Sequence, residues 1–260
     1  MQIRSCGRVV TPRAGRGGCG RIVTPRANRG GNGGGVSPPP LFMIRVKVCG
    51  ITNLRDAMTA VDAGADALGF IFVEKTPRFV TPEQATPIIR RLPPFVTPVG
   101  VFWDHSAGHV KAVSEACGLR ALQFHGQETP EDLADYTLPV IKTIKLPPAS
   151  TIEGLPEYRV RELSEVLRYQ HVGAAILLDS AARWSEGETR EPIEWHLARR
   201  VDANRVRIIL SGGLDPDNVA RAIEIVRPYA VDVNSGVESE PGTKDPAKVR
   251  RFLAEARRVG

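Results

Sequence analysis

The stretch VKVCGITN, residues 46–53, contains the start of a strand–helix unit. A short β-branched run ends in Cys49, Gly50 allows the chain to turn, and Thr52 and Asn53 are residues that cap the first turn of a helix. A thiol at the end of such a strand is either a small buried hydrophobic residue or a reactive group. The rest of the sequence has to decide between these two interpretations.

From Met43 onward, short β-branched runs alternate with amphipathic stretches, a pattern typical of parallel sheets. Strands are expected at residues 44–48, 67–73, 97–103, 121–124, 140–144, 174–178, 206–210 and 230–234. Helices are expected to begin near Asn53, Pro82, Ser106, Pro130, Ile152, Pro192, Pro216 and Pro246. Four of these prolines follow a Thr or Asp, which can cap a helix whose first residue is proline.

Eight strand–helix units in about 218 residues predict one α/β domain at residues 43–260, a (β/α)8 TIM barrel. A doubly wound open sheet is the alternative. That fold would need fewer strands or a second domain, and no linker-like segment follows Met43.

Residues 1–42 have a different composition from the rest of the chain. CGRVVTPRAGRGG at 6–18 is followed by CGRIVTPRANRGG at 19–31, a 13-residue repeat with two changes, and then by Gly- and Pro-rich sequence. Such a segment cannot bury enough apolar surface to offset the entropy of ordering, so it is predicted to be a disordered arm.

The arm also accounts for the basic charge of the chain. It contains seven arginines and no Lys, Asp or Glu, so the net charge of +6 becomes −1 for residues 43–260 (6 − 7 = −1). The arm is interpreted as a nucleic-acid contact, as a targeting segment, or as sequence upstream of a true start at Met43. The repeat and the position of Met43 favour the last, so nucleic acid is not expected as a partner.

The remaining composition indicates a globular protein of the reducing cytoplasm. Of the residues, 42% are apolar and 25% are charged, and no apolar run approaches the roughly 20 residues of a membrane span. The four cysteines, Cys6, Cys19, Cys49 and Cys117, have neither the spacing of a zinc site nor that of a disulfide framework.

Active sites of such barrels lie at the carboxyl ends of the strands. The residues expected there include Cys49, Arg78, His125 and Asp179. Glycines follow the seventh and eighth strands, where backbone N–H groups can cradle a phosphate. The predicted phosphate site comprises Gly212, Gly213, Ser235 and Gly236.

Each of these side chains also has a plain structural interpretation. Cys49 could be core packing, Asp179 a loop or cap residue, Arg78 a surface charge and His125 a structural histidine. Because side chains alternate along a strand, Lys47 should point inward one layer below Cys49 and favour its thiolate. Strand eight neighbours strand one in a closed barrel, so an interior pair of Lys47 with Asp232 is expected.

Eight motifs, in order and spacing, closely resemble the phosphoribosylanthranilate isomerases of tryptophan biosynthesis. They are KVCGIT (47–52), GADALGF (64–70), KTPRFVTPEQA (75–85), PPFVTPVGVF (93–102), LQFHG (122–126), ILLDS (176–180), LSGGLDPDNV (210–219) and AVDVNSGVE (230–238). The resemblance implies a TIM barrel that catalyses an Amadori rearrangement of N-(5'-phosphoribosyl)anthranilate without a metal or organic cofactor. It leaves the choice between monomer and homodimer open.

The resemblance also implies roles for particular residues. Cys49 corresponds to the general base and Asp179 to the general acid, whose pKa the apolar run before it could raise. Arg78 corresponds to the arginine that holds the anthranilate carboxylate, a task suited to a bidentate fork. His125 is placed with the substrate-binding residues, and the glycines after strands seven and eight correspond to the phosphate site.

One segment departs from the family pattern. After Asp179 the family has a glycine-rich closing loop, whereas Ser180 to Glu194 retains a single glycine, Gly187, before Trp195. This departure leaves two alternatives, an enzyme acting on both substrates and a phosphate-binding barrel without activity. A third alternative is the related histidine-pathway isomerase, which runs the same rearrangement, but that family has aspartate where Cys49 stands, so the cysteine argues against it.

Overall fold

The computed structural model describes residues 43–146, 164–173, 175–180, 192–202 and 206–259. The predicted arm at 1–42, the predicted helix start at Ile152 and most of the segment between Asp179 and Trp195 lie outside the described residues. The contacts divide the chain into two units, Met1–Pro39 and Pro40–Gly260, and all described residues belong to the second.

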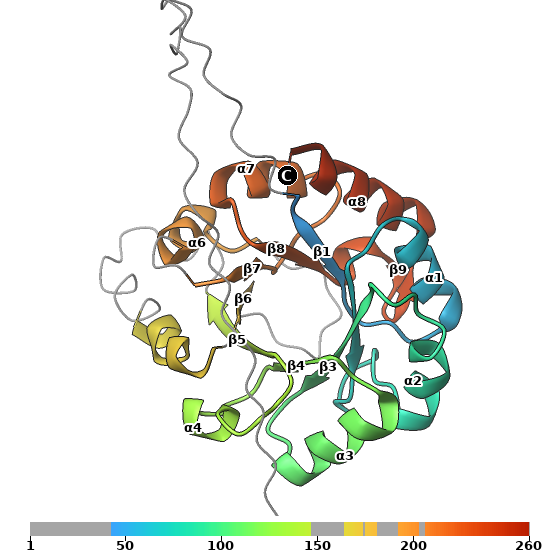
Figure 1. The fold of residues 1–260 in the computed structure, drawn as a ribbon. Helices are drawn as coiled ribbons and strands as arrows, with labels where there is room; N and C mark the ends of the chain where they lie inside the picture. Colours follow the sequence, from blue (N-terminus) through green and yellow to red (C-terminus); the bar gives the residue numbers. More distant parts are fainter. Residues whose placement is uncertain (1–42, 147–163, 174, 181–191, 203–205, 260) are drawn as a thin grey trace, which may run out of the picture. The chain divides into compact units, whose positions relative to one another are not determined.

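Eight parallel strands close into a barrel in sequence order (Figure 1). The last strand pairs with the first, with Lys47 opposite Asp232, and this closure rules out the open sheet. The strands are β1 (Arg45–Val48), β2 (Ala67–Ile71), β3 (Thr97–Phe102), β4 (Ala121–Phe124), β5 (Val140–Leu146), β6 (Ala175–Ser180), β7 (Ile208–Leu210) and β8 (Ala230–Val233). The predicted TIM barrel is confirmed, although several strands begin or end one to two residues from their expected bounds.

Helices surround the barrel (Figure 1). They are α1 (Leu54–Asp62), α2 (Pro82–Ile89), α3 (Ala107–Cys117), α4 (Pro130–Leu133), α6 (Trp195–Asp202), α7 (Val219–Val226) and α8 (Pro246–Val259), and residues 164–168 are helical as well. The proline starts of α2 and α4 are confirmed with their caps, because Thr81 and Thr129 each accept the N–H of the third helical residue.

Two helices begin three residues later than predicted. The predicted cap is present, because the Asp215 carboxylate accepts the N–H groups of Asp217 and Asn218, but residues 216–218 form a turn and α7 begins only at Val219. Glu194 accepts the N–H of His196 at 2.9 Å, so α6 begins at Trp195 and not at Pro192.

Alternate side chains of the strands point toward the helices or into the barrel. The outward set joins the helices in a large apolar core, which includes Phe70, Phe102 and Phe124. Inside the barrel, an apolar layer at the amino-terminal end comprises Val99, Ala121, Ile141, Leu177, Ile209 and Ala230. The next layer toward the carboxyl ends is polar, and above it Cys49 packs with Ile71 and Val101.

A short antiparallel hairpin follows β8 on the carboxyl side of the barrel. After the 3-10 turn η3 (Ser235–Val237) it comprises β9 (Glu238–Glu240) and β10 (Thr243–Lys244). Thr52 donates a hydrogen bond to Gly242 O, and Lys244 N–H donates to Asp56, so the hairpin is tied to the start of α1. Among the described residues, no helix is long and apolar enough to cross a membrane.

Candidate active site

Cys49 lies directly after β1 at the floor of the barrel mouth and is only 4% exposed. Its N–H donates to Val233 O at 2.8 Å, which fixes the backbone of the strand end. A Cβ atom added to Gly69 would lie 2.6 Å from the Cys49 sulfur and 3.1 Å from Lys47 Nζ. Gly69 therefore makes room for the thiol. Gly69 is not among the predicted site residues, although a glycine inside an apolar strand signals a close approach.

The interior pair of Lys47 and Asp232 is confirmed. Lys47 Nζ lies 2.8 Å from Asp232 Oδ1, and both side chains are buried. Ser211 Oγ lies 3.3 Å from the second Asp232 oxygen and donates to it. Burial by itself favours the neutral amine, but the Asp232 carboxylate and Cys49 together outweigh it, so the pKa of Lys47 lies above its ordinary value.

The expected lowering of the Cys49 pKa is wrong in its net direction. Burial raises the pKa of the Cys49 thiol, and the Lys47 ammonium opposes this increase without cancelling it. Asp232, only one layer below, also acts against the thiolate. The expectation gave too little weight to burial, which is the largest influence on the pKa of this thiol and which Lys47 does not offset.

Asp179 and His125 are brought together across the mouth. Asp179 belongs to β6 itself, and one of its oxygens lies 3.5 Å from His125 Nε2. The other oxygen accepts the N–H of Ser180 at 2.9 Å. His125 therefore contacts the predicted general acid.

A column of side chains that the sequence analysis missed backs His125. The Trp103 ring stacks on the imidazole with centroids 5.3 Å apart, and Lys145 Nζ lies 4.1 Å from the Trp103 centroid. Trp103 and Lys145 lie at the ends of β3 and β5, so position alone was the signal that could have found them.

Arg78 lies in the loop after β2 and is buried, which excludes the surface-charge interpretation. Its Nε and Nη2 donate to the two oxygens of Glu238 at 2.9 and 2.6 Å. The side edge of the guanidinium is therefore occupied by the hairpin. A ligand carboxylate would meet the edge formed by the two terminal nitrogens, and not the whole fork that the sequence analysis assigned to it.

The loops after β7 and β8 meet each other as a phosphate site requires. Gly212 and Gly213 have φ angles of 77° and 70°, and a Cβ atom on Gly236 would lie 2.0 Å from Leu214 O. In the described part of the chain, the N–H groups of Gly212, Gly213 and Gly236 have no protein acceptor. Such donors can receive the oxygens of an anion.

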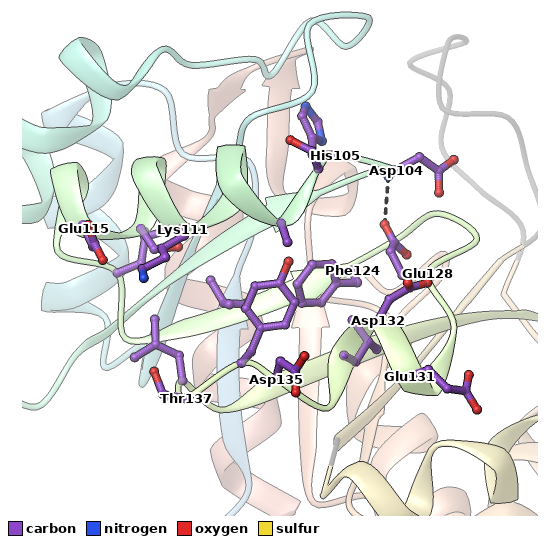
Figure 2. A pocket seen from close by; sticks show the side chains of 18 of the residues that line it. Asp104, His105, Lys111, Glu115, Phe124, Glu128, Glu131, Asp132, Asp135 and Thr137 are labelled. Atoms are coloured by element: carbon purple, nitrogen blue, oxygen red, sulfur yellow. Dashed lines mark hydrogen bonds between the residues drawn. The ribbon is translucent and has the colours of Figure 1, made fainter.

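A separate cavity of about 1050 Å³ lies outside the barrel mouth, between α3, β4 and α4 (Figure 2). Outward-facing Leu122 and Phe124 line it, and Glu115, Glu131 and Asp135 stand around it. It exists because α4 has only four residues and covers little of β4. The outward direction of its lining separates this cavity from the site that contains Cys49 and Asp179.

Comparison with known proteins agrees with this geometry. The model of the N-(5'-phosphoribosyl)anthranilate (PRA) isomerase family matches residues 46–255. The N-(5'-phosphoribosyl)anthranilate isomerase of Geobacter sp. strain M21 is 46% identical over 217 residues, which cover 84% of this chain and all of that protein.

Solved structures give the same result. The phosphoribosyl anthranilate isomerase of Thermotoga maritima has a TM-score of 0.73 and 39% identity, covering 82% of this chain and 98% of that one. An isomerase in complex with reduced 1-(o-carboxyphenylamino)-1-deoxyribulose 5-phosphate has a TM-score of 0.70, with the same identity and coverage. With its closed barrel and its matched length, the chain belongs to the phosphoribosylanthranilate isomerase family.

Proposed function

We propose that Cys49 and Asp179 are the base and the acid by which this isomerase rearranges N-(5'-phosphoribosyl)anthranilate to 1-(2-carboxyphenylamino)-1-deoxyribulose 5-phosphate in tryptophan biosynthesis. One observation carries the proposal. The barrel order β6, β7, β8, β1 puts the glycine loops after β7 and β8 between the carboxyl of Asp179 and the thiol of Cys49. A sugar phosphate anchored at these loops would have an acid on one side and a base on the other.

The reaction needs one proton to be delivered and one to be removed. Asp179 donates its proton to the furanose oxygen as the bond from this oxygen to C1' breaks, and the nitrogen lone pair forms a C=N bond. The Cys49 thiolate then removes the proton from C2', which gives an enolamine that tautomerises to the ketose. An acid and a base held apart in this way suit the two steps.

Two further side chains position the reacting groups. Arg78 holds the anthranilate carboxylate through its terminal nitrogens, because Glu238 already holds the other edge. His125, in contact with Asp179, orients that carboxyl and faces the substrate. Trp103 stacks behind the imidazole of His125 and supports the orientation that brings it into contact with Asp179.

The proposal is tested by the turnover of the wild-type protein. Phosphoribosylanthranilate generated in situ is fluorescent, and its fluorescence is expected to decay when the protein is added. The aminoribosyl phosphate of the histidine pathway is the matched control and is expected to react far more slowly. An intact barrel that turns over neither substrate would contradict the enzyme assignment, and turnover of the second substrate alone would identify the sister activity.

The pH dependence follows from the raised pKa of Cys49. The base acts as thiolate, whose fraction falls as the pH drops below the thiol pKa, so kcat/KM is expected to rise with pH across the neutral range. The midpoint is expected above the ordinary thiol value of about 8.5. A pH profile of kcat/KM between pH 6 and pH 10 measures this, and a plateau already reached near pH 7 would contradict it.

The family includes a dimeric member, the Thermotoga maritima isomerase, and this chain has a surface suited to self-association. Phe95 is 95% exposed, and Met43 and Tyr229 are exposed as well. All three residues precede strands, so they lie at the amino-terminal end of the barrel, away from the site. A homodimer through this end would bury them.

Replacing Phe95 by serine is therefore expected to shift the protein from dimer to monomer in sedimentation at micromolar concentration, with kcat unchanged. Leu167 is also an exposed apolar residue, but it belongs to the short helix at 164–168 and not to a segment directly before a strand, so Leu167→Ser is the matched control. A wild type that is already monomeric would contradict the homodimer.

The enzyme is assigned to the cytoplasm. The free thiols of Cys49 and Cys117 support this assignment, since reduced cysteines persist in that compartment.

A further inference from the structure

The floor of the site contains more buried charge than the proposed reaction uses. Cys49 lies among three cations and two carboxylates, all of them buried: Lys47, Arg78, Lys244, Asp232 and Glu238. These five groups carry one surplus positive charge while Cys49 is a thiol. When Cys49 becomes a thiolate, the cluster is neutral. A buried cluster with an unbalanced charge is costly, so the identity of the surplus cation matters.

The contacts identify the surplus cation. Lys47 has its own carboxylate, Asp232, at 2.8 Å. Arg78 has a two-point contact with Glu238. Lys244 Nζ reaches the same Glu238 at 2.9 Å, at the oxygen that also accepts from Arg78 Nε. Glu238 therefore serves two cations, and Lys244 has no carboxylate of its own among its side-chain contacts.

The other contacts of the Lys244 ammonium are neutral oxygens next to the thiol-bearing strand. Nζ donates to Asn234 O and Oδ1 at 3.1 and 2.9 Å. Asn234 follows Val233, whose carbonyl accepts the N–H of Cys49. A Cβ atom on Gly50 would lie 2.6 Å from Asn234 Oδ1, so the ammonium and the peptide after Cys49 flank the same amide.

The surrounding elements supply no other close counter-charge for Lys244 among the described residues. Asp56 accepts the backbone N–H of Lys244 and an Asn53 amide hydrogen in the first turn of α1, where the helix dipole favours a negative charge. The Lys244 side chain is itself 0% exposed, so water does not screen it.

We propose that Lys244 is a second counter-cation of the Cys49 thiolate beside Lys47, and a positioning residue at the end of the β9–β10 hairpin. This role rests on the proposed function of Cys49 as base. The electrostatic directions agree with it. Burial lowers the pKa of Lys244, and Glu238 and the Cys49 thiolate act in the opposite direction. Lys47 opposes the increase of the Cys49 pKa caused by burial most strongly, and Lys244 opposes it as well.

The test is a titration of Cys49 in the substrate-free full chain. Protein labelled with 13C at the cysteine Cβ is titrated by NMR, and Cys49 is assigned by the signal missing in Cys49→Ala. Lys244→Met retains the length of the side chain without its charge. It is expected to raise the titration midpoint of Cys49 by about one pKa unit or more, which is about tenfold less thiolate below the midpoint.

A second variant gives a shift of the opposite sign. Glu238→Gln removes a negative charge from the same cluster and is expected to lower the midpoint. If the hairpin had a merely structural role, the titration midpoint of Cys49 would shift in the same direction in both variants. That result, or an unchanged midpoint in Lys244→Met, would overturn the proposal. If Lys244→Met does not fold, the direction of the shift in Glu238→Gln decides.

The titration separates this inference from the function on which it rests, because it needs no turnover. If the wild type has no isomerase activity but the two variants shift the Cys49 midpoint in opposite directions, the role of Lys244 as counter-cation holds and the isomerase assignment fails. If the wild type is active and Lys244→Met leaves the titration midpoint of Cys49 unchanged, the isomerase assignment holds and the role of Lys244 as counter-cation fails.

Discussion

Replacing Cys49 by alanine is expected to lower kcat by at least about a thousandfold, within the range seen when an acid–base group is lost. Loss of the thiol removes the only proposed acceptor for the C2' proton. Binding should change little, because the phosphate loops and Arg78 are untouched, so KM should stay near its wild-type value. The measurement is the decay of phosphoribosylanthranilate fluorescence at saturating substrate.

Cys117 offers a matched control for this variant. It is the second buried free cysteine of the described residues, at the end of α3 and away from the mouth. Cys117→Ala should cost some stability through lost packing and leave kcat unchanged. A comparable loss of kcat in both variants, or a Cys49→Ala enzyme that retains a tenth of its activity, would remove Cys49 as the base.

The second large effect concerns stability. Lys47→Met is expected to lower the free energy of unfolding by about 3–5 kcal/mol, because the Asp232 carboxylate would remain buried with only a hydroxyl as partner. Asp232→Asn should be destabilising for the mirror-image reason. Urea unfolding followed by circular dichroism gives these values, provided that the transition is two-state.

Two controls isolate the buried pair. The double variant Lys47→Met/Asp232→Asn should lose less stability than the sum of the single changes, since neither charge is then left alone. Arg251 and Asp217 form an exposed ion pair on the surface, and Arg251→Met should cost less than about 1 kcal/mol. A loss equally small in Lys47→Met would show that the interior pair contributes no more than a surface one.

The architecture and the main candidate residues could be predicted from local sequence patterns. Strand and helix signals depend on neighbouring residues, and barrel closure then makes β8 the partner of β1 by topology. For that reason the pair of Lys47 with Asp232 was predictable from side-chain alternation together with barrel closure. The placement of Cys49, Asp179 and the glycine loops at one rim follows from the same rule, that parallel strands end on one face.

The failures have a common cause, which is that they depend on distances across the fold. Trp103, the contact of His125 with Asp179 and the room left by Gly69 arise where different strands meet. No pattern within one segment carries this information.

The sequence by itself therefore determined which groups reach the mouth of the barrel, and only the tertiary structure decided their charge state and direction. The pKa of Cys49 depends on a balance between burial and several charges, in which burial is the largest influence. Arg78 could be expected in the site, but the edge it presents was decided by Glu238, 160 residues away. Periodicity follows from the local backbone, whereas electrostatics at a site sums over every element that packs there.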